Sequence, residues 1–325
     1  MKNVRLQYVD VAKGIGILLV VIGHMFPVHS IVASIYSFHM PLFFILSGFF
    51  LNSESSVKSM FVRGCKMLII PYAFTATMTF LLSLIIDREN SLNTFWGIFL
   101  VDCKIGTFAV NSIGAIWFLI CLFISRIIAL VALKKTNGVL VVFTLAVILL
   151  FYSNYHKDIK LPLCVLEAIV TSIFVLVGFY IRKSNLLDKN FDVKLLFVVT
   201  IFFFSFARYV PIASRINLYP LGTINILISS CLSYLLIVLC KNLENNGIAK
   251  KININRYLSY CGRYSLIILC FHSIEVHFQL LSRLIPSIYA TILFNIIILS
   301  CIPLIIQKVY FLRWIFISKT FKFKE

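Results

Sequence analysis

Lys13 and His24 stand out because their spacing could place two ionisable side chains on one face of a helix. They are 11 residues apart, which is about 20° short of three full helical turns and about 16 Å along the axis. The nine residues from Ile15 to Gly23 are apolar, so a helix entering a membrane near Lys13 would carry His24 to about half depth. A neutral imidazole can act there as a general base or nucleophile. A histidine hydrogen-bonded inside a helical bundle is the equally supported alternative.

Two further candidates flank this pair. Asp10 is three residues before Lys13 and could pair with it, whereas it is 14 residues from His24, too far along the axis to orient it. His39 lies in the segment SFHMPLFFILSGFF, residues 37–50, in which Pro41 should start or kink the second helix. An interfacial position is the alternative to a substrate-binding role for His39.

Arg63 and Lys66 could form an anion site. They lie one turn apart in FVRGCKMLIIPY, residues 61–72, where a guanidinium and an ammonium can reach the same anion. Such groups suit the phosphates of a nucleotide-bearing donor. Anchoring at the cytoplasmic surface by positive charge is the alternative.

The later candidates are Trp117 in AIWFLICLF, residues 115–123, and His272 in a histidine-rich segment. Trp117 should begin a helix on the outer side, as a membrane-interface anchor or a platform for a sugar ring. His272 and Glu275 share a helix face, but His277 is about 140° round from His272. We therefore expect no metal site.

Composition identifies the class of protein. The chain has 325 residues, of which 61% are hydrophobic and 13% charged, and its mean hydropathy is +0.99. A soluble protein of this size needs more charge to cover its surface, so we predict an all-α, polytopic transmembrane bundle forming one domain, residues 1–325. The net charge of +18 is spread over short loops, which argues against nucleic-acid binding. Nine cysteines without a CxxC pair indicate no disulfide framework.

Apolar segments predict about ten spanning helices. With the N-terminus inside, 21 Lys and Arg residues fall on the inner side and 7 on the outer side, which predicts cytoplasmic termini. The longest outer loop is 87–112, whose apolar part TFWGIFLVD should lie in the interface or re-enter. The predicted spans are Val11–Phe26, Ile35–Leu51, Met67–Ile86, Ile113–Leu133, Gly138–Tyr152, Leu161–Ile181, Leu195–Tyr209, Leu221–Cys240, Leu258–Phe278 and Ser287–Phe311.

Five motifs in order resemble the acyltransferase-3 family of bacterial integral-membrane acyltransferases, and within it the fucose 4-O-acetylase-like group. They are YVDVAKGIGILLVVIGH (8–24), FHMPLFFILSGFF (38–50), RGCKMLIIPY (63–72), AIWFLICLF (115–123) and GRYSLIILCFH (262–272). The resemblance implies about ten helices in the bacterial cytoplasmic membrane. It also implies transfer of a short acyl group, usually acetyl, from acetyl-CoA to a carbohydrate hydroxyl, with no permanently bound cofactor.

The resemblance also suggests roles for individual residues. His24 would be the general base or an acyl relay, supported by Lys13 and Asp10. Arg63 and Lys66 would bind the donor phosphates, although the family often has two arginines there and lysine lacks their bidentate geometry. Acceptor contacts would fall to Trp117, His39 and His272. The acceptor would be a carbohydrate from the cell envelope, free or lipid-linked, such as an O-antigen, capsule or exopolysaccharide unit.

Two other classes of function stay open at this point. A transporter could use His24, His39 and His272 as a proton path, but the very apolar middle helices favour one site over a conduit. A purely structural membrane subunit would retain its function when His24 is replaced by alanine.

Overall fold

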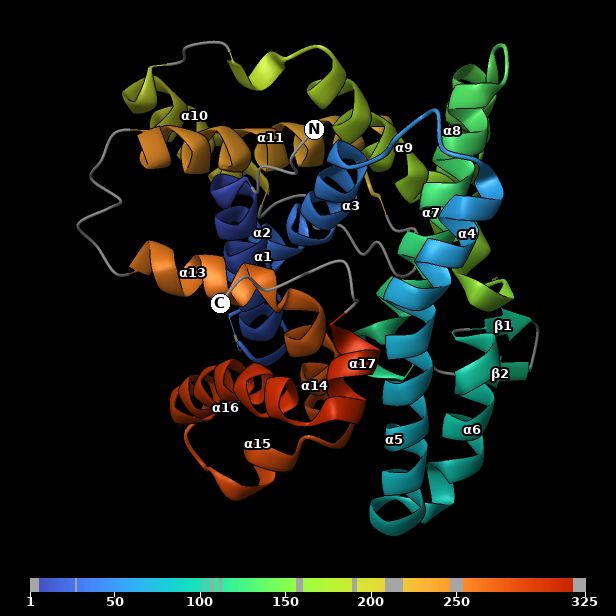
Figure 1. Cartoon of the computed structure of the whole chain (residues 1–325), viewed down its shortest axis with the longest axis vertical. Helices are drawn as coiled ribbons and strands as arrows, with labels where there is room; N and C mark the ends of the chain where they lie inside the picture. Colours follow the sequence, from blue (N-terminus) through green and yellow to red (C-terminus); the bar gives the residue numbers. More distant parts are fainter. Residues whose placement is uncertain are drawn as a thin grey trace. The chain divides into compact units, whose positions relative to one another are not determined.

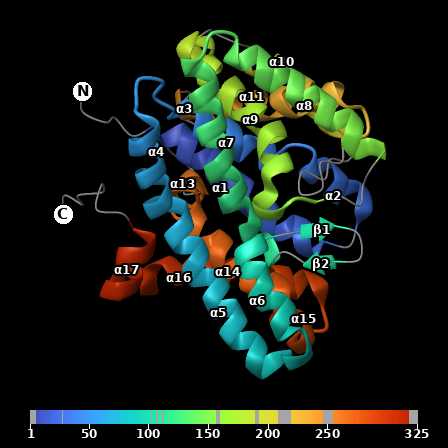
Figure 2. The same ribbon diagram turned by 90° about the vertical axis from the view of Figure 1, so that its right-hand side faces the viewer.

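The computed structural model describes residues 6–26, 28–101, 103–105, 108–110, 113–155, 160–188, 192–207, 219–245 and 254–317. They are almost entirely helical, with one antiparallel hairpin of two short strands (Figures 1 and 2). The predicted all-α class is therefore confirmed. The elements are α1 (Gln7–Met25), α2 (His29–Tyr36), α3 (His39–Phe49), α4 (Val57–Gly64), α5 (Ile70–Ile86), α6 (Ser91–Leu100), β1 (Cys103–Ile105), β2 (Phe108–Val110), α7 (Trp117–Lys134), α8 (Gly138–Tyr155), α9 (Val165–Lys183), α10 (Val193–Ala207), α11 (Thr223–Asn245), α13 (Ile254–Arg263), α14 (Ser265–Phe278), α15 (Leu280–Leu284), α16 (Ile288–Lys308) and α17 (Tyr310–Phe316).

Within the described ranges, seven helical segments are long and apolar enough to cross a membrane. Each overlaps a predicted span, and Val57–Ile86 begins ten residues before the predicted start at Met67. Two other predicted spans correspond to shorter apolar helices, Gly138–Ser153 and Ser265–Phe278. The remaining one, Leu195–Tyr209, overlaps the 15-residue α10 and ends outside the described residues. The count of ten spans and the cytoplasmic termini stay predictions.

The contacts divide the chain into two compact units. The first unit comprises Met1–Leu51, Phe143–Asn154 and Val170–Ser265, and the second comprises Asn52–Val142, Tyr155–Ile169 and Leu266–Glu325. The interpretation of the whole chain as one domain stays a prediction.

In the first unit, α1 and α13 cross at two glycines. A Cβ atom on Gly14 would collide with the backbone carbonyl of Leu258, and one on Gly262 would collide with the carbonyl of Asp10. Small residues let two helix backbones approach this closely, which favours dispersion contacts in an apolar environment. The crossing therefore fixes the segment of α1 that carries Asp10 and Lys13.

The predicted second span is broken between α2 and α3, and Pro41 explains the position of the break. Proline has no N–H group and its ring clashes with the carbonyl four residues earlier, which here belongs to Ser37. The Ser229 hydroxyl of α11 donates a hydrogen bond of 2.6 Å to that carbonyl. Ser229 is fully buried, so a side chain from a distant helix satisfies the carbonyl that the break leaves without a helical partner.

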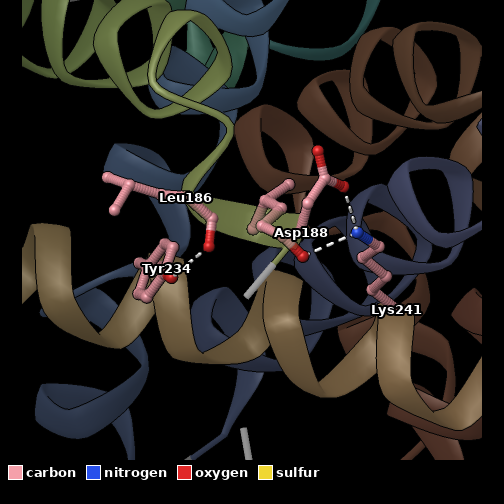
Figure 3. Close-up of polar contacts among 5 residues, drawn as sticks. Leu186, Asp188, Tyr234 and Lys241 are labelled. Carbon is pink, nitrogen blue, oxygen red and sulfur yellow. Dashed lines mark hydrogen bonds and ion pairs between the residues drawn. The ribbon is translucent and has the colours of Figure 1, made fainter. Parts of the chain in front are cut away.

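Side chains of α11 hold two other segments of the first unit. Lys241 donates hydrogen bonds to the Leu187 carbonyl at 2.6 Å and to the Asp188 carboxylate at 2.7 Å, while the Tyr234 hydroxyl donates to the Leu186 carbonyl at 3.1 Å (Figure 3). The bond from Lys241, followed by its charge, lowers the pKa of Asp188 below its ordinary value. The carboxylate of Glu244 accepts the backbone N–H of Tyr8 at 3.0 Å, which caps the first turn of α1.

In the second unit, α4 and α5 form one continuous helix through a π-helical turn, Cys65–Ile69. Pro71 follows this turn, and the wider turn accommodates a residue that cannot donate to the helix. The longest predicted loop, 87–112, contains α6 and both strands. The helix α6 runs back along α5 (Figure 1). Tyr72 donates to the Ile98 carbonyl at 2.9 Å, and the rings of Phe80 and Phe95 are 5.4 Å apart. The interfacial and re-entrant alternatives for this segment both stay predictions.

Candidate functional site

The structure places Lys13 and His24 on one helix, α1, as their spacing predicts. Lys13 is half-buried, and its Nζ lies 5.4 Å from the centre of the Phe50 ring. His24 is exposed and lies in the last turn of α1, one residue before the helix ends at Met25. A positive or polarisable group is favourable at that end because of the helix dipole. The half-depth position predicted for His24 assumes that the bilayer begins near Lys13, and it stays a prediction.

A backbone hydrogen bond determines the tautomer of His24. Its Nδ1 lies 2.9 Å from the Val20 carbonyl oxygen. A carbonyl can only accept, so Nδ1 carries the proton and Nε2 carries the lone pair of the neutral ring. In this tautomer the electron pair that a base or nucleophile uses lies on Nε2.

His39 repeats this arrangement in a buried position. It is the first residue of α3 and 4% exposed, and its Nδ1 lies 2.8 Å from the Ile35 carbonyl. The ring of Tyr36 lies near both histidines, with centroids 6.1 Å from His24 and 5.1 Å from His39. We call His24, Tyr36 and His39 the histidine–tyrosine cluster. His39 is therefore enclosed by protein within the first unit, and both its substrate-binding role and the interfacial alternative stay predictions.

Asp10 is buried in the first unit, where it is 8% exposed. Its backbone carbonyl forms part of the crossing with Gly262. Its proposed pairing with Lys13 and its supporting catalytic role stay predictions.

Arg63 and Lys66 are both exposed in the second unit. They border an open hollow of about 520 Å³ whose other lining residues are Ser56, Lys58, Ser59 and Val62. Within the described part of the chain, neither cation forms an ion pair with a carboxylate. The π-helical turn begins between them, so they are not at ordinary helical spacing. Surface cations without a carboxylate partner are suited to an external anion.

Another cation, Arg126, lies near Arg63. Gly64 packs against Phe123 of α7, where an added Cβ would be 2.6 Å from the ring, and the Phe61 and Phe123 rings are 5.3 Å apart. Arg126 lies nearly one turn further along α7, within electrostatic reach of Arg63. Arg126 falls within the predicted span Ile113–Leu133, and nothing in the spacing of residues indicates which helix α7 packs against.

Trp117 and His272 are held in the second unit by a tight backbone contact. Ser273 accepts the Ala115 N–H at 2.9 Å and donates to the Ile113 carbonyl at 3.0 Å. Gly114 has φ +55°, and a Cβ there would collide with Ser273, which only glycine avoids. Trp117 is 7% exposed and His272 is 0% exposed, so in this conformation neither side chain is open to a large acceptor.

Glu275 and His277 have other contacts. Glu275 accepts the Leu281 N–H at 2.9 Å, and the ring of His277 lies 4.7 Å from that of Phe278. Among the described residues, no three His, Cys, Asp or Glu side chains are placed to hold a metal ion.

The predicted site residues therefore fall into two sets. The first unit contains Asp10, Lys13, His24 and His39, and the second contains Arg63, Lys66, Trp117 and His272. Sequence reasoning missed Tyr36 and Ser273. Tyr36 is three residues before His39, a helical spacing that could have drawn attention to it, whereas nothing in the sequence indicates the contact of Ser273 with residues 113–115.

Comparison with known proteins assigns the family. Residues 6–313 match the acyltransferase domain family Acyl_transf_3. The chain belongs to this family. It is also 34% identical over 135 residues to the nodulation protein NolL of Mesorhizobium japonicum, a match that covers 37% of this chain and 34% of that protein. No solved structure matches the chain. The family resemblance predicted from the motifs is confirmed, and the narrower fucose 4-O-acetylase-like group stays a prediction.

Proposed function

We propose that this member of the acyltransferase family transfers an acetyl group from acetyl-CoA to a hydroxyl of a cell-envelope carbohydrate, within the bacterial cytoplasmic membrane. The observation that supports it best is the anchored imidazole of His24, on a helix inside the family match. Its Nδ1 donates to the Val20 carbonyl, so the lone pair of the neutral ring lies on Nε2, and the side chain is exposed. A neutral, oriented imidazole is the commonest general base in enzymes.

In the base mechanism, Nε2 of His24 takes the proton of the acceptor hydroxyl as its oxygen attacks the thioester carbonyl. The carbon–sulfur bond then breaks, and the imidazolium returns the proton to the departing coenzyme A thiolate. In the relay alternative, Nε2 attacks the thioester first and releases coenzyme A. The acceptor hydroxyl then takes the acyl group from the imidazole. Both routes give an ester and free coenzyme A.

The donor phosphates would bind at the exposed cations of the second unit, Arg63 and Lys66, with Arg126 adding positive charge beside Arg63. Charge-assisted hydrogen bonds from guanidinium and ammonium groups are among the strongest contacts available to phosphate. Lys13, on the same helix as His24, would support the catalytic histidine. The acceptor contacts proposed for His39, Trp117 and His272 require access to side chains that are buried in this conformation.

The test uses membrane vesicles and acetyl-CoA labelled in the acetyl group, with wild type compared to His24→Gln. We expect His24→Gln to lower label in the envelope glycan by roughly 10²- to 10⁴-fold, the usual contribution of a positioned base. Free coenzyme A is measured with a thiol reagent in the same samples. His277→Gln is the matched control and should transfer label at the wild-type rate.

Three other outcomes would change the proposal. Equal transfer by wild type and His24→Gln would leave an acyltransferase but refute the role of His24. Coenzyme A release without label in a glycan would point to a non-carbohydrate acceptor. Folded wild type that neither releases coenzyme A nor transfers label would refute the proposal and favour a transporter.

A further inference from the structure

The hydroxyl of Tyr36 caps the end of the helix that carries His24. It donates a hydrogen bond of 3.2 Å to the Gly23 carbonyl. Gly23 lies in the last turn of α1, where carbonyls lack the N–H partner that a continuing helix would supply. Tyr36 thus satisfies the carbonyl of the residue directly before His24.

The fit around this bond is close. A Cβ atom on Gly23 would lie 2.9 Å from Cε1 of Tyr36 and 3.3 Å from Cγ2 of Ile35. The phenol ring therefore packs directly on the backbone of α1, and its centroid is 6.1 Å from that of His24. The phenol ring therefore restricts movement of the last turn of α1.

The order of this turn matters for the imidazole because its anchor lies within the same turn. The bond from His24 Nδ1 to the Val20 carbonyl spans one helical turn, and it needs residues 20–24 to remain helical. A helix end without a cap frays, and reacting groups displaced by about 1 Å can lose about 10²-fold in rate.

We propose that Tyr36 is a positioning residue for His24. Its hydroxyl holds the last turn of α1 through Gly23, and so keeps Nε2 of His24 oriented toward the thioester and the acceptor. The inference rests on the proposed role of His24. It also gives a reason for a tyrosine rather than a phenylalanine at position 36, because only the hydroxyl reaches the Gly23 carbonyl.

The first experiment compares Tyr36→Phe with a matched control, Tyr234→Phe. Tyr234 also lies in the first unit and donates to a backbone carbonyl, that of Leu186, at 3.1 Å (Figure 3). We expect Tyr36→Phe to lower kcat about three- to tenfold, the range for one hydrogen bond, at an unchanged KM for acetyl-CoA. Tyr234→Phe should keep the wild-type kcat. Rates are normalised to folded protein measured by size exclusion in detergent. A wild-type kcat for Tyr36→Phe, or equal losses in both variants, would overturn the proposal.

The second experiment combines Tyr36→Phe with His24→Gln. A positioning residue acts through the group that it positions, so the double variant should transfer label no more slowly than His24→Gln alone. A further three- to tenfold loss would show that Tyr36 acts independently of His24 and would overturn the proposal. Full activity of His24→Gln would refute the role of His24, and this inference with it, from the single variant alone.

A third variant approaches the contact from the other side. Gly23→Ala places a methyl group against the Tyr36 ring and keeps both the hydroxyl and the imidazole. We expect the same fall in kcat at constant KM, and no effect when His24 is already glutamine. A wild-type kcat for folded Gly23→Ala would contradict the proposed dependence of His24 on this contact.

Discussion

At the scale of single residues, the same local contact is made twice. His24 and His39 each direct Nδ1 to the carbonyl four residues earlier, that of Val20 or Ile35. Helical spacing within α1 makes this bond available to His24, so the sequence could predict it there, whereas the bond of His39 joins α3 to α2 across their break. The sequence could not predict Tyr36, because the approach of its ring to Gly23 depends on the direction of the chain between α1 and α2.

The cations of the second unit allow a residue-scale prediction about the donor. Replacing Arg63 and Lys66 together by glutamine should raise the KM for acetyl-CoA roughly tenfold or more, since each loses a charge-assisted hydrogen bond to phosphate. S-acetylpantetheine, which lacks the nucleotide phosphates, should react equally well with wild type and variant. The measurement is initial rate against donor concentration for both donors.

The control for this prediction is Lys134→Gln, which removes a charge at the exposed end of α7. It should leave both KM values unchanged. If the Arg63 and Lys66 variant affects the two donors equally, these residues serve only as surface anchors, which was the alternative reading of their positions.

At the scale of elements, the break between α2 and α3 shows what a sequence signal can and cannot locate. Pro41 predicts a start or kink in the second span, and the break occurs at the carbonyl that proline deprives of its partner. The replacement partner, Ser229, is 192 residues away in the chain. Only the packing of α11 against α3 brings it there, so the spacing of residues around Pro41 gives no indication of it.

Ser229→Ala should therefore destabilise the protein by about 1–3 kcal/mol, the cost of leaving a buried carbonyl without a donor. The measurement is reversible unfolding in detergent with increasing denaturant. Ser300→Ala is the control, because the Ser300 hydroxyl bonds to the Ile296 carbonyl of its own helix at 2.7 Å. That change should cost less than about 0.5 kcal/mol, and equal losses in both variants would argue against a special role for the Ser37 carbonyl.

At the scale of the whole molecule, hydropathy located most helices but not their grouping. Length and apolarity are properties of continuous segments, and all ten predicted spans overlap a helix. The two units are built from discontinuous segments, so their composition depends on contacts between distant residues. For the same reason, neither set of candidate site residues could be assembled from spacing alone.

Sidedness is the whole-molecule property most open to a direct test. The bias of Lys and Arg predicts both termini in the cytoplasm and an even number of spans. A fluorescent reporter that folds only in the cytoplasm should be bright at either end of the chain, while alkaline phosphatase fused there should be inactive. Opposite results at the two ends would mean an odd number of spans and would contradict the predicted topology.

The glycine crossing of α1 and α13 has a consequence for biosynthesis. The first helix leaves the ribosome long before its partner, because about 230 residues separate Met25 from Ile254. At 5–20 residues per second, α1 waits roughly 10–50 s before α13 exists. During that time the strip around Gly14 has no native partner, so newly made chains should be most vulnerable to membrane quality control in this interval. A change at Gly262 would extend that vulnerability indefinitely, and its first sign would be loss of protein from the cell rather than a slower enzyme.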